Sequence, residues 1–142
     1  MENTKSYRKV MVIDDTYVDR YIAERNIRKY NFAEEIITMG SARAALNYLL
    51  GLADKPDELP QLIFLDIRMP EMDGFGFLSE YEKLPDEVKM HCIIMMLTTS
   101  LNPEDHHRAN ANPYIQRFLN KPLNGEQLSH LINIENEIKV KN

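Results

Sequence analysis

Three carboxylates, one hydroxyl residue and one lysine stand where they could do chemistry together. Asp14-Asp15 and Asp66 each follow an apolar run, Thr98 follows another, and Lys121 follows a short mixed run. Carboxylates that share one pocket repel each other and raise each other's pKa, and a divalent cation relieves that repulsion. All-oxygen ligand sets suit a hard ion such as Mg²⁺. A metal, a nucleophilic carboxylate and a lysine are the parts needed for phosphoryl transfer to Asp66, and Thr98 could hydrogen-bond the product.

These side chains meet only if the runs before them are neighbouring strands of one sheet. Continuous short apolar runs are typical of strands buried on both faces of a parallel sheet. The predicted strands are 9–13, 35–39, 62–65, 92–97 and 117–120. The predicted helices are about 16–30, 41–52, 74–84, 103–110 and 124–139. Five alternations of strand and helix predict an α/β fold with helices on both faces of the sheet. The carboxyl ends of the strands then share one edge, where ligands bind in such sheets.

Two of the predicted helices have distinct surfaces. The final helix should bury Leu128, Leu131, Ile132 and Ile138. The helix at 103–110 is nearly all polar, so it should pack weakly and be mobile or face a partner. His106-His107 on this helix have no acid-rich or cysteine motif nearby, and a solvated face is the interpretation for both.

Composition limits the possible functions. The 142 residues suit one domain, with a core over about 8–139 and no output domain after it. The net charge of −5 argues against nucleic-acid binding, and no apolar run approaches the length of a membrane span. The single cysteine, Cys92, excludes a disulfide within the chain. With a polar N-terminus that lacks a signal peptide, these features predict a cytoplasmic protein.

Four motifs in order resemble the receiver domain of bacterial two-component response regulators. They are Asp14-Asp15, the phrase at 65–74 (LDIRMPEMDG), Thr98-Thr99 and Lys121-Pro122. The likeness covers nearly the whole chain and points to the stand-alone, single-domain type. It implies a flavodoxin-like, doubly wound sheet of five parallel strands in the order 2-1-3-4-5 with five helices. It also implies a signalling switch rather than an enzyme, with autodephosphorylation at most.

The resemblance also implies roles for individual residues. Asp66 would take a phosphoryl group from a sensor histidine kinase or a phosphotransfer protein. Asp15, Asp66 and the backbone carbonyl of Arg68 would bind Mg²⁺, with Asp14 helping through water. Thr98 and Phe118 would be coupled switch residues that change a surface read by a downstream protein. The protein would act as a monomer or as a phosphorylation-dependent homodimer. The segment 110–113 departs from the Gly-Ala that the family often carries before the last strand.

Each motif also has an ordinary structural interpretation. An acid pair after a strand often caps a helix, as Thr98 could, while Lys121 could be a solvated loop residue and Phe118 a core residue.

Three other functions fit this type of sheet. An aspartate-nucleophile phosphatase needs an acid two residues after its nucleophile, where this chain has Arg68. A flavin carrier needs a glycine-rich phosphate loop in place of the acid pair. A phosphorylation-independent adaptor would keep the fold alone.

The lifetime of a phosphoryl group on Asp66 depends on the side chains beside the path of the attacking water. The resemblance places Arg68 and Ser100 there. Neither can orient water as a carboxylate or amide would, and Arg68 could cover the phosphoryl group with hydrogen bonds. The sequence therefore predicts a long-lived phosphoryl state.

Overall fold

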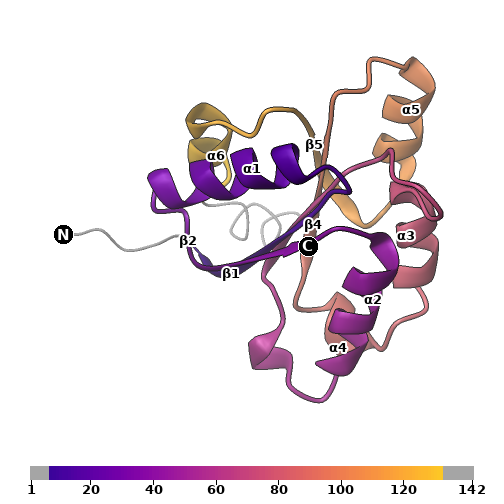
Figure 1. Ribbon diagram of the computed structural model, residues 1–142. Coiled ribbons are helices and arrows are strands. Elements are labelled where there is room, and N and C mark those ends of the chain that lie inside the picture. Colours follow the sequence, from indigo (N-terminus) through magenta and orange to yellow (C-terminus); the bar gives the residue numbers. More distant parts are fainter. Residues whose placement is uncertain (1–6, 133–142) are drawn as a thin grey trace.

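The computed structural model describes residues 7–132. These residues contain one five-stranded parallel sheet, and helices lie on either side of it (Figure 1). The strands are β1 (Tyr7–Ile13), β2 (Ala33–Met39), β3 (Leu62–Leu65), β4 (Ile93–Thr98) and β5 (Ile115–Asn120). They pair in the order β2-β1-β3-β4-β5, as predicted. All four residues of the central strand β3 are buried. The flavodoxin-like fold class is therefore confirmed.

Helices cover both faces of the sheet because side chains alternate along each strand. Val10 and Val12 of β1 pack in one cluster with α1 (Tyr17–Lys29) and α6 (Gly125–His130). Met11 and Ile13 face the opposite cluster. That second cluster includes the helices α2 (Ala42–Gly51), α3 (Gly74–Tyr81), α4 (Asp86–Lys89) and α5 (Pro103–Ala111). The 3₁₀ turn η1 (Pro56–Glu58) lies between α2 and β3.

The expected capping residues begin their helices. The Ser41 hydroxyl accepts a hydrogen bond from the backbone N–H of Ala44, and the Asn102 side chain accepts one from Glu104. Pro103 follows Asn102 at the first helical position, where its missing N–H leaves no partner unsatisfied. These caps fix where α2 and α5 leave the sheet edge. No helix within residues 7–132 is long and apolar enough to cross a membrane.

The structure differs from the predicted elements in several places. The short helix α4 was not predicted, so the described residues contain six α-helices rather than five. Strands β1, β2 and β5 each begin two residues before the predicted start, and α3 ends three residues before the predicted end. Leu128 and Leu131 are buried as predicted, but the prediction for Ile132 was wrong, since 48% of it is exposed. Because α6 ends at His130, Ile132 no longer follows the helical spacing. Ile138 and the predicted helix beyond 132 lie outside the described residues.

Candidate functional site

The predicted chemical residues lie at the carboxyl edge of the sheet. Asp14 follows β1, Asp66 follows β3, Thr98 ends β4 and Lys121 follows β5. Asp14, Asp66 and Thr98 are 2%, 5% and 1% exposed. The backbone N–H of Asp66 donates to Ile13, and that of Lys121 donates to Thr98. Such bonds join the strand ends, so adjacent strands hold the four residues in place.

The three acidic residues form a cluster that fits a hard divalent cation. Asp14, Asp15 and Asp66 each offer one carboxylate oxygen, and these oxygens all lie within 4.8 Å of one another. Asp15 is exposed while the other two are buried. Oxygen ligands of this kind, with one side open for water, suit a small ion that keeps part of its hydration shell. The backbone carbonyl of Arg68 as a further ligand stays a prediction.

Lys121 is surrounded by carboxylates. Its ammonium nitrogen lies 2.5 Å from Asp14 Oδ2, 2.8 Å from Asp19 Oδ2 and 3.4 Å from Asp66 Oδ1. Asp19, from the first turn of α1, was not among the predicted site residues. Its position near the start of the helix that follows Asp14-Asp15 was the available signal. The lysine is thus positioned as a fixed cation beside Asp66.

Burial and the neighbouring charges together set the proton affinities of Asp66 and Lys121. It raises the pKa of Asp66 from 3.8 to about 6, with Lys121 opposing the rise and Asp14 adding to it. For Lys121, burial acts to lower the pKa, but hydrogen bonds with Asp14 and Asp19 and the charge of Asp66 raise it overall. Lys121 is therefore a permanent cation at physiological pH. Asp66 is ionised at neutral pH but is easier to protonate than an ordinary aspartate.

The loop after Asp66 requires glycine at position 74. A Cβ atom there would lie 2.5 Å from the backbone oxygen of Asp66 and 3.0 Å from the Cα of Ile67. The N–H of Gly74 donates to the backbone oxygen of Ile67, and the Asp73 side chain caps α3. Glu71 adopts a left-handed backbone with φ of 70°. Close packing against α3 therefore fixes the backbone that carries Asp66.

The two predicted switch residues have different surroundings. Thr98 is buried, and its hydroxyl oxygen accepts a hydrogen bond from the backbone N–H of Ser100 at 3.1 Å. Phe118 is half-buried, and its ring stacks on that of His106 with centroids 4.0 Å apart. No polar contact within residues 7–132 joins Thr98 to the phosphoacceptor candidate. The coupling of Thr98 and Phe118 stays a prediction.

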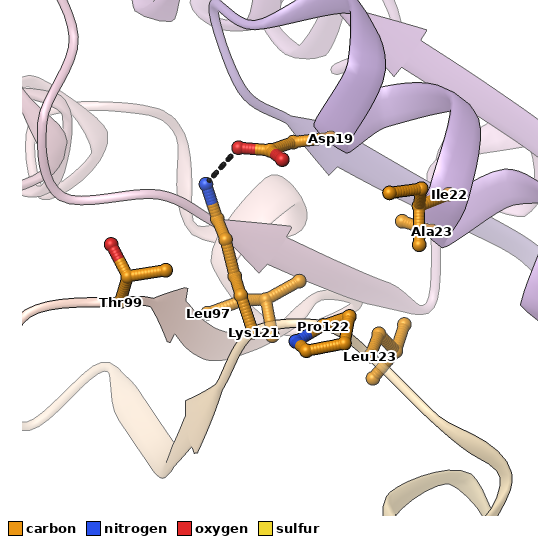
Figure 2. Close-up of a pocket in the computed structure, with 8 residues that line it drawn as sticks. All are labelled: Asp19, Ile22, Ala23, Leu97, Thr99, Lys121, Pro122 and Leu123. Atoms are coloured by element: carbon orange, nitrogen blue, oxygen red, sulfur yellow. Dashed lines mark hydrogen bonds and ion pairs between the residues drawn. The ribbon is translucent and has the colours of Figure 1, made fainter.

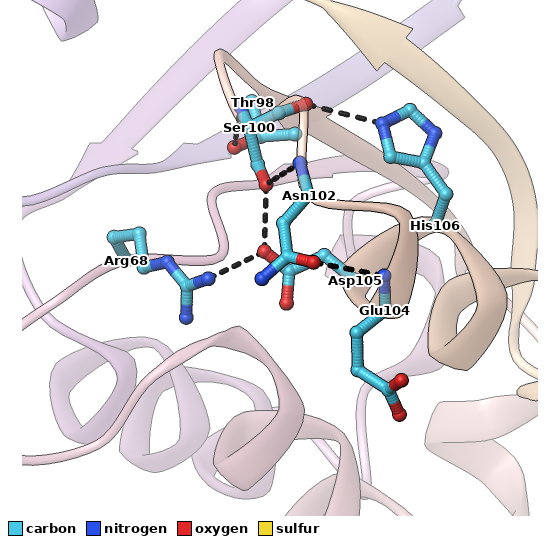
Figure 3. A network of polar contacts seen from close by, with 7 residues as sticks. All are labelled: Arg68, Thr98, Ser100, Asn102, Glu104, Asp105 and His106. Atoms are coloured by element: carbon cyan, nitrogen blue, oxygen red, sulfur yellow. Dashed lines mark hydrogen bonds and ion pairs between the residues drawn. The ribbon is translucent and has the colours of Figure 1, made fainter.

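The polar helix α5 is anchored by polar contacts instead of an apolar stripe (Figure 3). Asp105 is 3% exposed, and Ala109 is its one buried apolar residue. His107 is exposed as predicted, but the prediction of a solvated face was wrong for His106. The His106 ring is half-buried and lies 3.1 Å from the backbone oxygen of Ser100. Periodicity could not reveal these contacts because it counts apolar residues only.

A shallow cleft of about 260 Å³ lies beside Lys121. Figure 2 shows Asp19 on α1 reaching Lys121 from one side of this cleft. Most of the other side chains that line the cleft are apolar. Its walls come from α1, the end of β4 and the segment after β5: Asp19, Ile22, Ala23, Leu97, Thr99, Lys121, Pro122 and Leu123. The cleft reaches Lys121 and Asp19, but its walls include none of the three clustered aspartates.

Comparison with known proteins agrees with this architecture. The family model for the response regulator receiver domain matches residues 10–133. A two component response regulator from Cytophaga hutchinsonii superposes with a TM-score of 0.85 at 28% identity, over 94% of this chain and 99% of that one. The probable methanogenesis regulatory protein FilR2 of Methanothrix harundinacea is 27% identical, over 87% of this chain and 77% of its own length.

Receiver sequences of this kind also occur within larger proteins. The sensor histidine kinase CheAY of Helicobacter pylori is 29% identical over 92% of this chain, which spans only 16% of that kinase. The chain belongs to the response regulator receiver domain family of two-component signalling.

Proposed function

We propose that the protein is a phosphorylation-controlled switch in a two-component phosphorelay and that Asp66 is its phosphoacceptor. One observation carries the proposal: a buried carboxylate ends the central strand, beside a fixed ammonium group at 3.4 Å and within a cluster of acids. Structural acids are usually paired and closed off. Here the acids outnumber the cation and one of them, Asp15, is exposed to solvent.

The phosphoryl donor is a phosphohistidine on a sensor histidine kinase or a phosphotransfer protein. An ionised Asp66 oxygen attacks phosphorus as the P–N bond breaks, and the leaving imidazole keeps the electron pair of that bond and takes up a proton. The oxygens of the phosphoryl group carry negative charge throughout, so a nearby cation lowers the barrier. Lys121 supplies that charge from a fixed position. The pKa of about 6 leaves Asp66 ionised and nucleophilic at neutral pH.

Mg²⁺ is the cofactor that this set of ligands fits. Asp14, Asp15 and Asp66, with the backbone carbonyl of Arg68, would bind it. When bound, the ion neutralises charge on the carboxylates and on the transferring oxygens. Removal of Mg²⁺ should therefore stop phosphorylation without unfolding the sheet.

Phosphorylation would act on other proteins by changing the surface of this one. Thr98 would bond the phosphoryl group, and Phe118 would turn inward, shifting a two-state equilibrium of the surface formed by α5 and β5. The protein would act in the cytoplasm on a downstream protein, as a phosphoacceptor rather than an enzyme for a separate substrate. It would do so as a monomer or as a phosphorylation-dependent homodimer, without binding nucleic acid.

Labelling tests the proposal directly. Wild-type protein should gain one phosphoryl group by intact mass when incubated with a small acyl phosphate and Mg²⁺, and none with a chelator. Asp66→Asn should remain unlabelled. Asp57→Asn changes the net charge in the same way at an exposed position in η1, which precedes β3, whereas the acid cluster follows the carboxyl ends of the strands, and it should label normally. Full labelling of Asp66→Asn would overturn the assignment.

A further inference from the structure

A single turn of α5 holds the loops that follow two of the proposed functional residues. The carboxylate oxygen Oδ2 of Asp105 lies 2.5 Å from Arg68 Nη2 and 2.6 Å from Ser100 Oγ. Arg68 is the second residue after Asp66, and Ser100 is the second after Thr98. Figure 3 shows Arg68 and Ser100 meeting the Asp105 carboxylate from different sides. One buried acid therefore joins the loop after β3 to the loop after β4.

The neighbouring residue extends the same contact to Phe118. His106 places Nε2 3.1 Å from the backbone oxygen of Ser100, and its ring stacks on Phe118 at an interplanar angle of 27°. We call Asp105, His106 and their partners Arg68, Ser100 and Phe118 the α5 latch. The latch contacts the segment after the phosphoacceptor, the segment after Thr98 and the switch aromatic at once.

The Arg68–Asp105 ion pair is unequal in its exposure. The Arg68 side chain is 62% exposed, whereas that of Asp105 is 4% exposed. Arg68 can therefore leave the pair and become hydrated at little cost. Asp105 would then remain as a buried carboxylate without a cation, which is strongly unfavourable unless its own surroundings move. Separating the pair therefore destabilises the present position of α5, because α5 carries the buried Asp105.

A phosphoryl group on Asp66 would compete for the same guanidinium. Arg68 follows Asp66 by two residues, and Ile67 between them is packed in the core, which fixes the start of the loop. Guanidinium groups bind phosphoryl oxygens through parallel hydrogen bonds, and a phosphoryl group carries more negative charge than one carboxylate. Asp105 already neutralises part of the charge that Arg68 would offer, so the two anions compete for this one guanidinium.

We propose that Arg68 exchanges partners, from Asp105 to the phosphoryl group on Asp66, and that this exchange releases the α5 latch. Asp105 is then a positioning residue that lowers the affinity of the site for a phosphoryl group until α5 moves. Loss of the ion pair frees the first turn of α5, which carries His106 away from Phe118. The inference rests on the proposed function and adds a second route of coupling, through charge, beside that through Thr98.

The affinity for beryllofluoride tests the exchange. This non-covalent phosphoryl mimic is titrated in Mg²⁺ and followed by ¹⁹F NMR of the bound anion. Asp105→Asn keeps the shape of the side chain and removes its charge, so Arg68 is free, and binding should tighten roughly threefold to tenfold. Glu104→Gln is the matched control. It loses the same charge in the same turn, but its carboxylate is exposed and points away from Arg68 (Figure 3), so it should bind as the wild type does.

A double-mutant cycle shows whether the effect passes through Arg68. Arg68→Gln should weaken beryllofluoride binding, and adding Asp105→Asn to it should restore nothing. If Asp105→Asn binds no more tightly than wild type, or shows the same gain when Arg68 is absent, the exchange is wrong. A merely structural role for Asp105 would lower the melting temperature of the variant without this dependence on Arg68.

A second measurement needs no change at Asp105. The ring protons of His106 lie over Phe118, so their NMR shifts report the stacking. Saturation with beryllofluoride should move these shifts in wild type and should move them much less in Arg68→Gln. Equal changes in both proteins, or none in wild type, would overturn the proposal. If wild type neither binds beryllofluoride nor accepts label, both the proposed function and this inference are wrong. If wild type does both and the Arg68 variants behave as wild type, the proposed function stands and only the exchange of partners by Arg68 is wrong.

Discussion

Asp66→Asn should stabilise the metal-free protein, although it removes the phosphoacceptor. Burial, with a smaller contribution from Asp14 and against the pull of Lys121, raises the Asp66 pKa from 3.8 to about 6. Because a change of one in pKa corresponds to about 1.4 kcal/mol, the ionised carboxylate costs the folded state about 3 kcal/mol at neutral pH. Asparagine has the same shape and does not ionise. The variant should therefore gain up to about 3 kcal/mol in unfolding free energy.

The gain should depend on pH in one direction. The folded-state pKa lies above that of the unfolded chain, so between about pH 4 and pH 6 the folded state binds more protons. The unfolding free energy of the wild type therefore falls as pH rises through this window. Asp66→Asn has no carboxyl group at this position, so its unfolding free energy does not show this fall. The difference between them should be small below about pH 4, grow up to about pH 6 and then stay level.

Urea unfolding in the presence of a chelator, at several pH values from 4 to 8, measures the difference. Asp57→Asn, at an exposed position, should show no pH-dependent gain. Repeating the series in Mg²⁺ should reduce the advantage of Asp66→Asn, because an ion at about a hundred times its Kd stabilises the folded wild type by about 2.7 kcal/mol. A variant that is less stable than wild type at pH 7, or a gain independent of pH, would refute the reasoning.

Three further predictions concern the site and its loops. Lys121→Ala should bind Mg²⁺ almost as well as wild type but lose the change in hydrogen exchange over 98–120 that beryllofluoride induces; a normal response would exclude this role. Gly74→Ala should lower the unfolding free energy in urea by about 1 to 3 kcal/mol, because its Cβ would lie 2.5 Å from the Asp66 backbone oxygen, and unchanged stability would show that the loop can adjust. The phosphoryl group should decay faster after donor removal in Arg68→Asn and in Ser100→Glu, since the first loses a shield and the second gains a carboxylate that orients water. An unchanged or slower decay of Arg68→Asn would show that Arg68 is no shield.

The sequence predicted where the site lies because it predicted the parallel sheet that brings the site residues together. Apolar runs followed by Asp14, Asp66 and Thr98 could be recognised as buried parallel strands, and parallel strands end at a common edge. The alternation of strands with helices then predicted a parallel sheet with helices on both faces. The Asn102-Pro103 start of α5 was equally clear, because its capping chemistry is local.

Contacts between distant polar side chains could not be predicted. The Arg68–Asp105 ion pair joins residues 37 positions apart, and the Lys121–Asp19 hydrogen bond joins residues 102 apart. No periodic pattern relates such residues, and an acid near a helix start has a sufficient local explanation in the helix dipole. The helix α4 was missed because its four residues are too few to show helical spacing.

Asp66 is the proposed site of the phosphoryl group, and trapping the acyl phosphate shows which residue carries it. Protein incubated with a phosphodonor and Mg²⁺ is reduced with borohydride, which converts an aspartyl phosphate into homoserine, and peptides are then mapped by mass spectrometry. Homoserine is expected at position 66 alone, and none when a chelator replaces Mg²⁺. Homoserine at another aspartate, or an unmodified position 66 in fully phosphorylated protein, would contradict this assignment.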